Sequence, residues 1–429
     1  MQAVKLLGKT FSKGGYSNIL LDKTLKETDM SSQDKALCSA IYYGILERKI
    51  TLDHIISGYS KLKISKINPT ALNILRSGIY QLKFMDNIPD NAAVNESVNI
   101  AKKMKLQKLS GFINAVLRNF IRDGKKIKYP KDKLQRILVE YSVPLWLAKM
   151  LYDNYSESQV KSLLESSVEK PPVTVRLNNL KGNQADILSE MSGLEPKKTE
   201  IDGCFEIKNG NVTGEKSFKN GLFHVQDIAS QLCCMALDPK PCEKVLDLCS
   251  APGGKAFTMA ELSEDKAEIY AFDIHEHRVK LIQSGADRLG IKSVKPMQGN
   301  AQKYDENIPM ADKILCDVPC SGLGVIRRKP EIKYKNYEEF ERLPEIQYQI
   351  LETAAKYLKV GGELVYSTCT VNPKENGEVI KKFLKEHSDF NGVSFLENLG
   401  QPFGEFMVTL FPENFASDGF FISKIKRIE

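Results

Sequence analysis

The chain has 429 residues, of which 42% are hydrophobic and 27% charged, and its net charge is +7. This length predicts two or three domains with substantial cores, and the composition is that of a soluble globular protein. No stretch resembles a signal peptide or a membrane span, and the nine cysteines and five histidines form no C-x-x-C pair or metal-like cluster. We therefore expect a cytoplasmic protein with free thiols, no metal and no membrane partner.

Positive charge is concentrated at the front of the chain. Residues 1–140 carry 25 Lys and Arg against 12 Asp and Glu, whereas the remaining 289 residues carry 36 against 42. The excess is greatest between Lys102 and Arg136, where twelve basic residues oppose only two acidic ones. This asymmetry favours nucleic acid as a partner of the N-terminal part, although a solvated lysine-rich surface would give the same count.

The first 125 residues or so are predicted to be all helical, because segments such as Asn73–Phe84 and Ala92–Met104 show apolar recurrence near 3.6 residues. The basic segment 123–133, DGKKIKYPKDK, is predicted as a linker that contacts phosphates. Its candidate RNA-binding residues are Lys125, Lys126 and Lys128. Two amphipathic helices are expected between 134 and 155.

Two further patterns follow. Short strands at 173–177, 205–208 and 222–225 around a helix at 185–191 predict a small α+β module, with a four-stranded RNA-recognition type of sheet as one option. From Gln226 the pattern alternates strand and helix, with strands expected at 244–248, 268–273, 293–297, 312–317, 362–367, 389–396 and 419–425. The alternation predicts a mostly parallel, seven-stranded, Rossmann-like α/β sheet whose last strand is antiparallel at one edge. The expected domains are 1–133, 134–225 and 226–429.

The stretch Lys244–Lys255, KVLDLCSAPGGK, is typical of a buried strand, a glycine turn and a helix N-terminus. Such a turn brings backbone N–H groups close to a bound polar ligand. Asp273 ends the next predicted strand, twenty residues after Gly253, where a carboxylate can accept hydrogen bonds from a ribose. Thr258 replaces the third glycine of the dinucleotide fingerprint, which disfavours a nicotinamide oxidoreductase and leaves S-adenosylmethionine as the preferred ligand.

Two cysteines follow the fourth and fifth predicted strands. Cys320 lies in Asp317-Val-Pro-Cys-Ser-Gly and Cys369 lies in Ser367-Thr-Cys-Thr. Because ligand and catalytic groups collect at the carboxyl ends of parallel strands, both thiols are expected on the rim that carries the glycine loop. Five other cysteines are interpreted as buried apolar residues or as neighbours of that loop: Cys233, Cys234, Cys242, Cys249 and Cys316.

A thiol beside a methyl donor suits one reaction in particular. Carbon 5 of a pyrimidine is a poor nucleophile until a thiolate adds at carbon 6 and makes it enamine-like. The adduct must then lose its carbon-5 proton to a general base and expel the thiol. A carboxylic acid at N3 of the ring would stabilise the adduct, and Asp317, Cys320 and Cys369 together meet these needs.

Four motifs resemble the successive motifs of the RNA cytosine-5 methyltransferase family: DLCSAPGGK, DVPCSG, VIRRKPEIK and YSTCTVNPKEN. The front of the chain, with LLDKTLKE, SSQDKALCSAIYYGIL and NAAVNESVNIAKK, resembles the NusB-like helical RNA-binding domain. This pairing is characteristic of bacterial 16S rRNA enzymes of the Sun/Fmu/RsmB type. The resemblance implies a class I methyltransferase fold, S-adenosylmethionine as cofactor and 16S rRNA as partner, and we expect a monomer.

The resemblance also implies the roles of single residues. Cys369 would be the nucleophile and Cys320 would assist product release, an assignment that the residues alone leave open because DNA enzymes use the earlier cysteine. Asp317 would lie between cofactor and base, and Lys255 would hold the reacting groups or neutralise the rim. The residues assigned to the cofactor are Cys249, Ser250, Ala251, Pro252, Gly253, Gly254, Lys255, Asp273, Arg278, Asn300 and Asp317.

One position departs from the family pattern, because Asn300 stands where an aspartate is usual. An asparagine keeps a carbonyl acceptor for the adenine amino group. Arg327, Arg328 and Lys329, in the loop after Cys320, are expected to contact RNA phosphates around a base turned out of its stack, rather than to form a solvated loop. Two alternatives stay open: a tRNA cytosine-5 methyltransferase, and a non-catalytic NusB-like RNA-binding protein.

Overall fold

The computed structural model describes residues 1–13 and 17–429 and divides into two compact units. The helical unit comprises Met1–Lys170 together with Ile326–Lys335, and the α/β unit comprises Pro171–Val325 and Asn336–Glu429. A short excursion of the second half of the chain therefore belongs to the first unit. No helix of the described residues is both long and apolar enough to cross a membrane.

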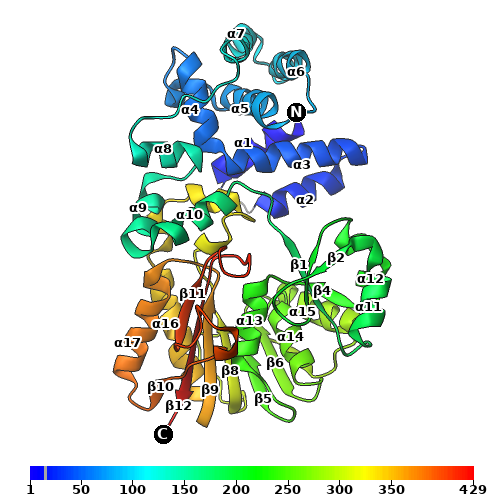
Figure 1. Ribbon diagram of the computed structural model, residues 1–429, viewed down its shortest axis with the longest axis vertical. Coiled ribbons are helices and arrows are strands. Elements are labelled where there is room, and N and C mark those ends of the chain that lie inside the picture. Colours follow the sequence, from blue (N-terminus) through cyan, green and yellow to red (C-terminus); the bar gives the residue numbers. More distant parts are fainter. Residues whose placement is uncertain (14–16) are drawn as a thin grey trace. The chain divides into compact units, whose positions relative to one another are not determined.

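The helical unit confirms the all-helical prediction for the front of the chain (Figure 1). Its α-helices are α1 (Gln2–Lys13), α2 (Ser17–Glu27), α3 (Ser32–Glu47), α4 (Lys49–Tyr59), α5 (Pro69–Phe84), α6 (Asp90–Lys103), α7 (Ser110–Arg122), α8 (Lys133–Glu140), α9 (Leu145–Asn154) and α10 (Glu157–Ser166). Helix α5 begins where Asn68 caps two backbone N–H groups and Pro69 takes the first helical position. Its buried face, which includes Ile74 and Leu75, lies in the core of the unit.

A small antiparallel sheet opens the α/β unit. Its strands, in the spatial order β2-β3-β1-β4, are β1 (Val173–Leu177), β2 (Pro196–Lys198), β3 (Cys204–Ile207) and β4 (Phe223–Val225), with α11 (Gln184–Glu190) and α12 (Lys216–Lys219) beside them. The sequence predicts three of these strands. It misses β2, which is short and solvated and has no alternating apolar pattern.

The main sheet has eight strands, and five of them form the parallel run β9-β8-β5-β6-β7. The strands are β5 (Lys244–Asp247), β6 (Glu268–Asp273), β7 (Val294–Gln298), β8 (Ala311–Asp317), β9 (Leu358–Thr368), β10 (Phe390–Gly392), β11 (Met407–Leu410) and β12 (Phe420–Arg427). The mostly parallel Rossmann-like sheet is thus confirmed. Strand β12 runs antiparallel to β9 as expected, but it is not the edge, because β10 and β11 both pair with it.

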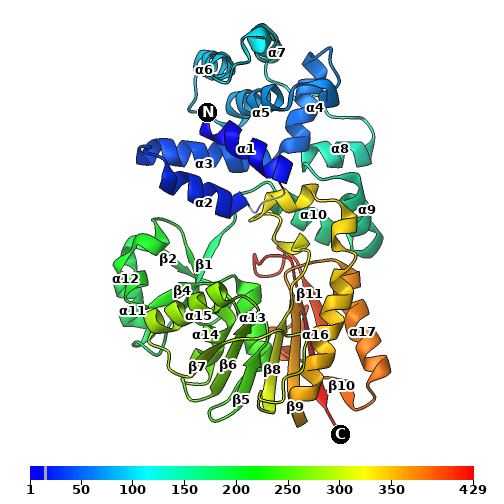
Figure 2. The same ribbon diagram turned by 180° about the vertical axis from the view of Figure 1, so that it is seen from behind.

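Helices cover both faces of the main sheet (Figures 1 and 2). The helices of this part are α13 (Ile228–Leu237), α14 (Gly254–Leu262), α15 (Glu276–Leu289), α16 (Leu343–Tyr357) and α17 (Gly377–Glu386). Successive strand residues point to opposite faces, so Val245 packs with α13, α14 and α15 whereas Leu246 packs with α16 and α17. A sheet buried on both faces explains the continuous apolar runs seen in the sequence.

A buried ion pair joins the small sheet to the helix that carries the glycine loop. Arg176 of β1 donates from Nε and Nη2 to the two carboxylate oxygens of Glu261 on α14, at 2.7 and 3.0 Å. Both side chains are only 6% exposed. A bidentate pair of this kind fixes orientation as well as distance.

We expect Arg176→Met to lower the free energy of unfolding by about 3–5 kcal/mol, because it leaves the Glu261 carboxylate buried and unpaired. Adding Glu261→Leu should restore part of that loss. The matched control is Lys280→Met, which breaks the exposed pair with Glu276 on α15 and should cost less than about 1 kcal/mol. Urea denaturation measures all four proteins, and equal losses for Arg176→Met and the control would contradict the prediction.

Candidate functional site

The predicted cofactor loop follows β5 and leads into α14. Gly253 adopts a left-handed backbone with φ of 105°, and a Cβ there would lie 2.5 Å from the Phe257 ring. Only glycine is tolerated at such a position. The loop borders a cavity of about 240 Å³. Its lining residues are Val225, Gln226, Asp227, Ser230, Asp247, Cys249, Ser250, Ala251, Pro252, Gly254, Lys255 and Asp317. Among the described residues, no group of three or more Cys, His, Asp and Glu side chains could hold a metal ion.

Lys255 and Asp317 form an ion pair at this cavity, with Nζ 2.7 Å from Oδ2. The other carboxylate oxygen, Oδ1, accepts a hydrogen bond from Ser367 Oγ at 2.9 Å. Burial lowers the pKa of Lys255, but the Asp317 carboxylate more than offsets this effect and leaves the pKa above its ordinary value. Lys255 is therefore a fixed positive charge, and both oxygens of Asp317 are held in place.

Strand register brings the two predicted cysteines together. Asp317 of β8 is opposite Ser367 of β9, and each cysteine follows within three residues. The sulfur atoms of Cys320 and Cys369 are 3.2 Å apart. The contact with Cys369, together with burial, raises the pKa of the Cys320 thiol well above its ordinary value. The Cys320 thiol therefore stays protonated.

The backbone around the cysteines is held by a buried acid that the sequence analysis did not single out. The Glu375 carboxylate is fully buried and accepts hydrogen bonds from Ser321 N at 2.8 Å and from Gln347 Nε2 at 3.0 Å. Gly324 N donates to Cys369 O at 3.1 Å, so the two cysteine loops are also joined directly. Glu375 lies within the YSTCTVNPKEN motif, but nothing in that pattern distinguishes a buried glutamate from an exposed one.

The remaining cysteines serve packing, with one exception. Burial raises the pKa of Cys233 to about 12 and those of Cys234 and Cys316 well above the ordinary value, so these thiols stay protonated. Cys249 lies half-buried in the loop. Cys242, which we expected to be buried or beside the loop, is exposed. It lies in the turn before β5, where its backbone has φ of 68° and the side chain does not enter the core.

Asp273 lies at the carboxyl end of β6, as predicted, and is 4% exposed. Its Oδ1 accepts from His275 N at 2.9 Å and its Oδ2 is 2.8 Å from Arg278 Nη1. Arg278 also donates to Ala251 O at 2.7 Å and so links the acid to the glycine loop.

Asn300 lines a second cavity of about 280 Å³ beyond β6 and β7, together with Phe272, Met297 and Tyr304. Its Oδ1 accepts a hydrogen bond from Gln302 N at 3.0 Å. The carbonyl expected to face an adenine is therefore already engaged by the backbone. Tyr304 stacks on Tyr357 with ring centroids 4.9 Å apart, which gives this cavity an aromatic wall.

Asp247 is the most unusual group of the site, and its local sequence gives no sign of this because it ends an ordinary apolar strand. It is completely buried, and neither oxygen accepts a hydrogen bond of good distance and angle from the described chain. Burial raises its pKa to about 7, and the nearby Ser250 hydroxyl opposes this rise only in part. A buried carboxylate of this kind at a cavity is a site for a cationic or hydrogen-donating ligand.

None of the residues predicted to contact RNA lines the cavity beside Lys255 and Asp317. Lys125 and Lys128 pair with Asp90 and Asp123, and Lys126 is exposed. The three basic residues after Cys320 do not form a freely solvated loop, because Arg327 is 6% exposed and the next two are half-buried: Arg328 and Lys329. All three belong to the helical unit.

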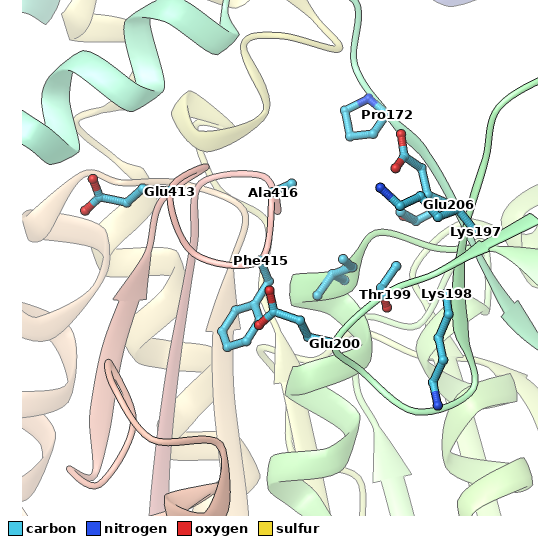
Figure 3. A pocket seen from close by; sticks show the side chains of 11 residues that line it. Pro172, Lys197, Lys198, Thr199, Glu200, Glu206, Glu413, Phe415 and Ala416 are labelled. Atoms are coloured by element: carbon cyan, nitrogen blue, oxygen red, sulfur yellow. The ribbon is translucent and has the colours of Figure 1, made fainter.

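A larger cavity of about 550 Å³ lies between β2 and the loop that follows β11 (Figure 3). Lys197 and Lys198 line it together with Glu200, Glu206 and Phe415. Its lining contains no thiol and none of the predicted site residues, and its charges are mixed. Lys255 and Asp317 line the smaller cavity instead, and the two cysteines follow the strand ends that carry Asp317 and Ser367.

Comparison with known proteins identifies the family. Residues 234–426 match the family model described as "16S rRNA methyltransferase RsmB/F", residues 1–122 match the "NusB family", and residues 143–201 match the ferredoxin-like domain of RsmF/B-like methyltransferases. The chain is 37% identical to the "Probable ribosomal RNA small subunit methyltransferase B" of Bacillus subtilis, over 99% of this chain and 98% of that protein. The chain belongs to this family of rRNA methyltransferases.

Other relatives agree. Ribosomal RNA small subunit methyltransferase B of Escherichia coli is 34% identical over 87% of this chain and 86% of its own length. The crystal structure of the protein PH0851 is 27% identical, with a TM-score of 0.82 over 99% of this chain and 97% of that one. A methyltransferase homologue from Pyrococcus horikoshii is 28% identical, with a TM-score of 0.59 over 70% of this chain and all of its own. Membership confirms the predicted enzyme class and the NusB-like front.

Asp247→Asn should stabilise the ligand-free protein above about pH 7. In the unfolded chain the carboxyl ionises near 3.8, and in the folded chain only near 7. Between these values the folded state binds more protons, so the free energy of unfolding of the wild type falls as pH rises through this window. The asparagine variant lacks that dependence. Thermal denaturation at pH values across the window measures the difference, and parallel curves for the two proteins would contradict it.

Proposed function

We propose that this chain transfers the methyl group of S-adenosylmethionine to carbon 5 of a cytosine in 16S rRNA through a covalent bond between Cys369 and carbon 6. The observation that carries the proposal is the pair of sulfur atoms 3.2 Å apart beside the Lys255–Asp317 ion pair. Two thiols in contact, each within three residues of the paired strand ends Asp317 and Ser367, suit a reaction that needs one thiol to add and one to assist release. A reaction at a more nucleophilic atom would need neither.

The residues around the cavity fit S-adenosylmethionine by their chemistry. The ligand is cationic at its sulfonium and ammonium groups, and the described rim carries the carboxylates of Asp247, Asp273 and Asp317 against the cations of Lys255 and Arg278. Asp247, whose oxygens accept no well-formed hydrogen bond, suits the ammonium. Asp273 suits the ribose, and the aromatic cavity that Asn300 lines suits the adenine. When bound, the ligand supplies an electrophilic methyl group.

Each protein group has a defined part in the reaction. The Cys369 thiolate adds to carbon 6 of the cytosine, which moves electron density to carbon 5 and forms one carbon–sulfur bond. Asp317, fixed by Lys255 and Ser367, hydrogen-bonds the N3 edge of the ring, where electron density from the new bond also collects, and stabilises the adduct. After carbon 5 is methylated, its proton passes to a general base and the electron pair expels Cys369. Cys320, which burial and its neighbour keep protonated, assists this release.

Cys369→Ala should reduce methyl transfer to 16S rRNA by at least about three orders of magnitude, because the variant lacks the thiol that adds to carbon 6. The assay follows transfer of tritium from labelled S-adenosylmethionine to 16S transcripts, with a tRNA transcript as the comparison substrate. Cys242→Ala is the matched control and should retain full activity, since that thiol is exposed outside the site. An active Cys369→Ala variant would refute the nucleophile, and preferential labelling of tRNA would refute the substrate.

Cys320→Ala should instead accumulate a protein–RNA adduct, because addition proceeds and release is impaired. The adduct would appear as a slow band on a denaturing gel that requires both RNA and S-adenosylmethionine. The double variant Cys320→Ala with Cys369→Ala should give no such band. An adduct that persists in the double variant would show that a different residue bonds to the RNA.

Affinity for S-adenosylmethionine should increase as pH rises through about 7, because ionised Asp247 attracts the ligand's ammonium group. Calorimetric titration of the wild type above and below this pH measures the effect. Asp247→Asn should bind more weakly at high pH and show a flatter profile. Equal affinities of the two proteins for S-adenosylmethionine above pH 7 would show that Asp247 does not contribute to binding.

A further inference from the structure

The segment Ile326–Lys335 begins six residues after Cys320 and belongs to the helical unit. The residues before it, up to Val325, and those after it, from Asn336, belong to the α/β unit. The loop that carries Cys320 is thus covalently continuous with a segment folded among the N-terminal helices. None of the reaction steps above accounts for this excursion.

Glu331 fixes the segment to the start of a helix. It is 9% exposed, and its two carboxylate oxygens accept hydrogen bonds from Ser17 N at 2.9 Å and Ser17 Oγ at 2.8 Å. Ser17 is the first residue of α2. A carboxylate at a helix N-terminus satisfies a free N–H group and interacts favourably with the helix dipole.

Lys333 fixes the same segment to the ends of two other helices. Its side chain is completely buried, and Nζ donates to Glu47 O at 2.8 Å and to Tyr141 O at 3.3 Å. Glu47 is the last residue of α3, and Tyr141 is the C-cap of α8. An ammonium group suits these carbonyl ends for the same reason that Glu331 suits the start of α2. This burial lowers the pKa of Lys333 to about 7.

The neighbouring Tyr334 adds a third attachment. Its hydroxyl lies 2.9 Å from Ser142 Oγ, and Lys49 Nζ lies 4.6 Å from the centre of its ring. The short helix η6 (Pro330–Tyr334) that carries these side chains is therefore matched to α2, α3 and α8 by charge and by hydrogen bonding. It can occupy this position only when those helices are formed.

The other end of the loop is fixed within the α/β unit. Ser321 Oγ lies 2.7 Å from Thr370 Oγ1, and Gly324 N donates to Cys369 O. The backbone between Cys320 and η6 is therefore held at both ends. Movement at Glu331 or Lys333 would act on the loop in which the Cys320 sulfur meets that of Cys369.

We infer that Glu331 and Lys333 are positioning residues for methyl transfer, which hold the Cys320 loop in its reactive geometry by fixing the following segment to three helix ends of the helical unit. This inference rests on the proposed function for its kinetic consequence. The role differs from simple stabilisation, because it predicts a change at the thiols in a protein that remains folded.

Glu331→Gln tests the inference with the least disturbance, since the amide keeps one acceptor for Ser17 and loses the charge. We expect the methyl-transfer rate at saturating RNA to fall about tenfold, less than the roughly hundredfold loss that a misplacement of about 1 Å can cause. Affinity for S-adenosylmethionine, measured by calorimetry, should stay within about twofold of the wild type. Lys333→Met, which removes the ammonium but keeps the chain length, should act in the same direction.

Glu27→Gln is the matched control. It makes the same substitution at the other end of α2, where the side chain is 63% exposed and forms a surface pair with Lys23. It should leave the rate unchanged. If Glu331→Gln lowers the melting temperature or RNA affinity but not the rate at saturating RNA, the residue is merely structural and the inference is overturned.

A second readout does not depend on catalysis. The alkylation rate of Cys320 by a thiol reagent, followed by mass spectrometry without RNA, should rise about tenfold in Glu331→Gln relative to Glu27→Gln because the loop is released. Ser17→Ala, which removes one of the two hydrogen bonds, should give a smaller rise. An unchanged alkylation rate overturns the inference. Loss of folding in both Glu331→Gln and Ser17→Ala also overturns it. A wild type that methylates no rRNA cytosine refutes the proposed function and leaves this thiol test standing.

Discussion

The parallel pairing of β8 with β9 is the constraint on which the site depends. Asp317 and Ser367 are paired across the two strands, so the segments that follow leave the sheet side by side. The sulfur atoms of the two cysteines in these segments are 3.2 Å apart. A slip of one residue would turn each of these side chains to the other face of the sheet. The apolar runs on both strands, which are buried on both faces of the sheet, prevent such a slip. The packing of the core therefore determines where the reacting side chains lie.

The polar part of the site is built on that frame, and most of its groups are held by neighbours. Asp317 is held by Lys255 and Ser367. Glu375 accepts hydrogen bonds from the backbone of the Cys320 loop and from the side chain of Gln347. Asp247 is the exception, since its buried oxygens accept no well-formed hydrogen bond. A buried carboxylate without a hydrogen-bond partner lowers the stability of the fold. Such carboxylates are concentrated at sites where a ligand supplies the missing partner.

Much of this arrangement follows from local sequence. The alternation of strands and helices predicts the parallel sheet, and the rule that functional groups collect at the carboxyl ends of strands places Asp273, Cys320 and Cys369 on one rim. The glycine loop is also predicted, because Gly253 needs a backbone that other residues avoid. The family of the chain follows from the same motifs and is confirmed by full-length relatives.

What the sequence does not reveal depends on contacts between distant residues. Nothing around Asp247 distinguishes it from a solvated strand end, and the four residues of β11 are too few to show a strand pattern before β12 pairs with them. The excursion Ile326–Lys335 has the sequence of a basic loop, yet Glu331 and Lys333 are buried by partners about 190 to 310 residues away in the chain.

The central claim is that Cys369 bonds to carbon 6 of a cytosine. It is tested most directly with a 16S rRNA fragment containing 5-fluorocytidine, whose fluorine cannot leave as a proton does and so traps the adduct. Peptide mass spectrometry of the trapped complex should place the added nucleotide on Cys369 of the wild-type protein. A nucleotide on Cys320, or no covalent product while methylation of normal RNA proceeds, would contradict the account.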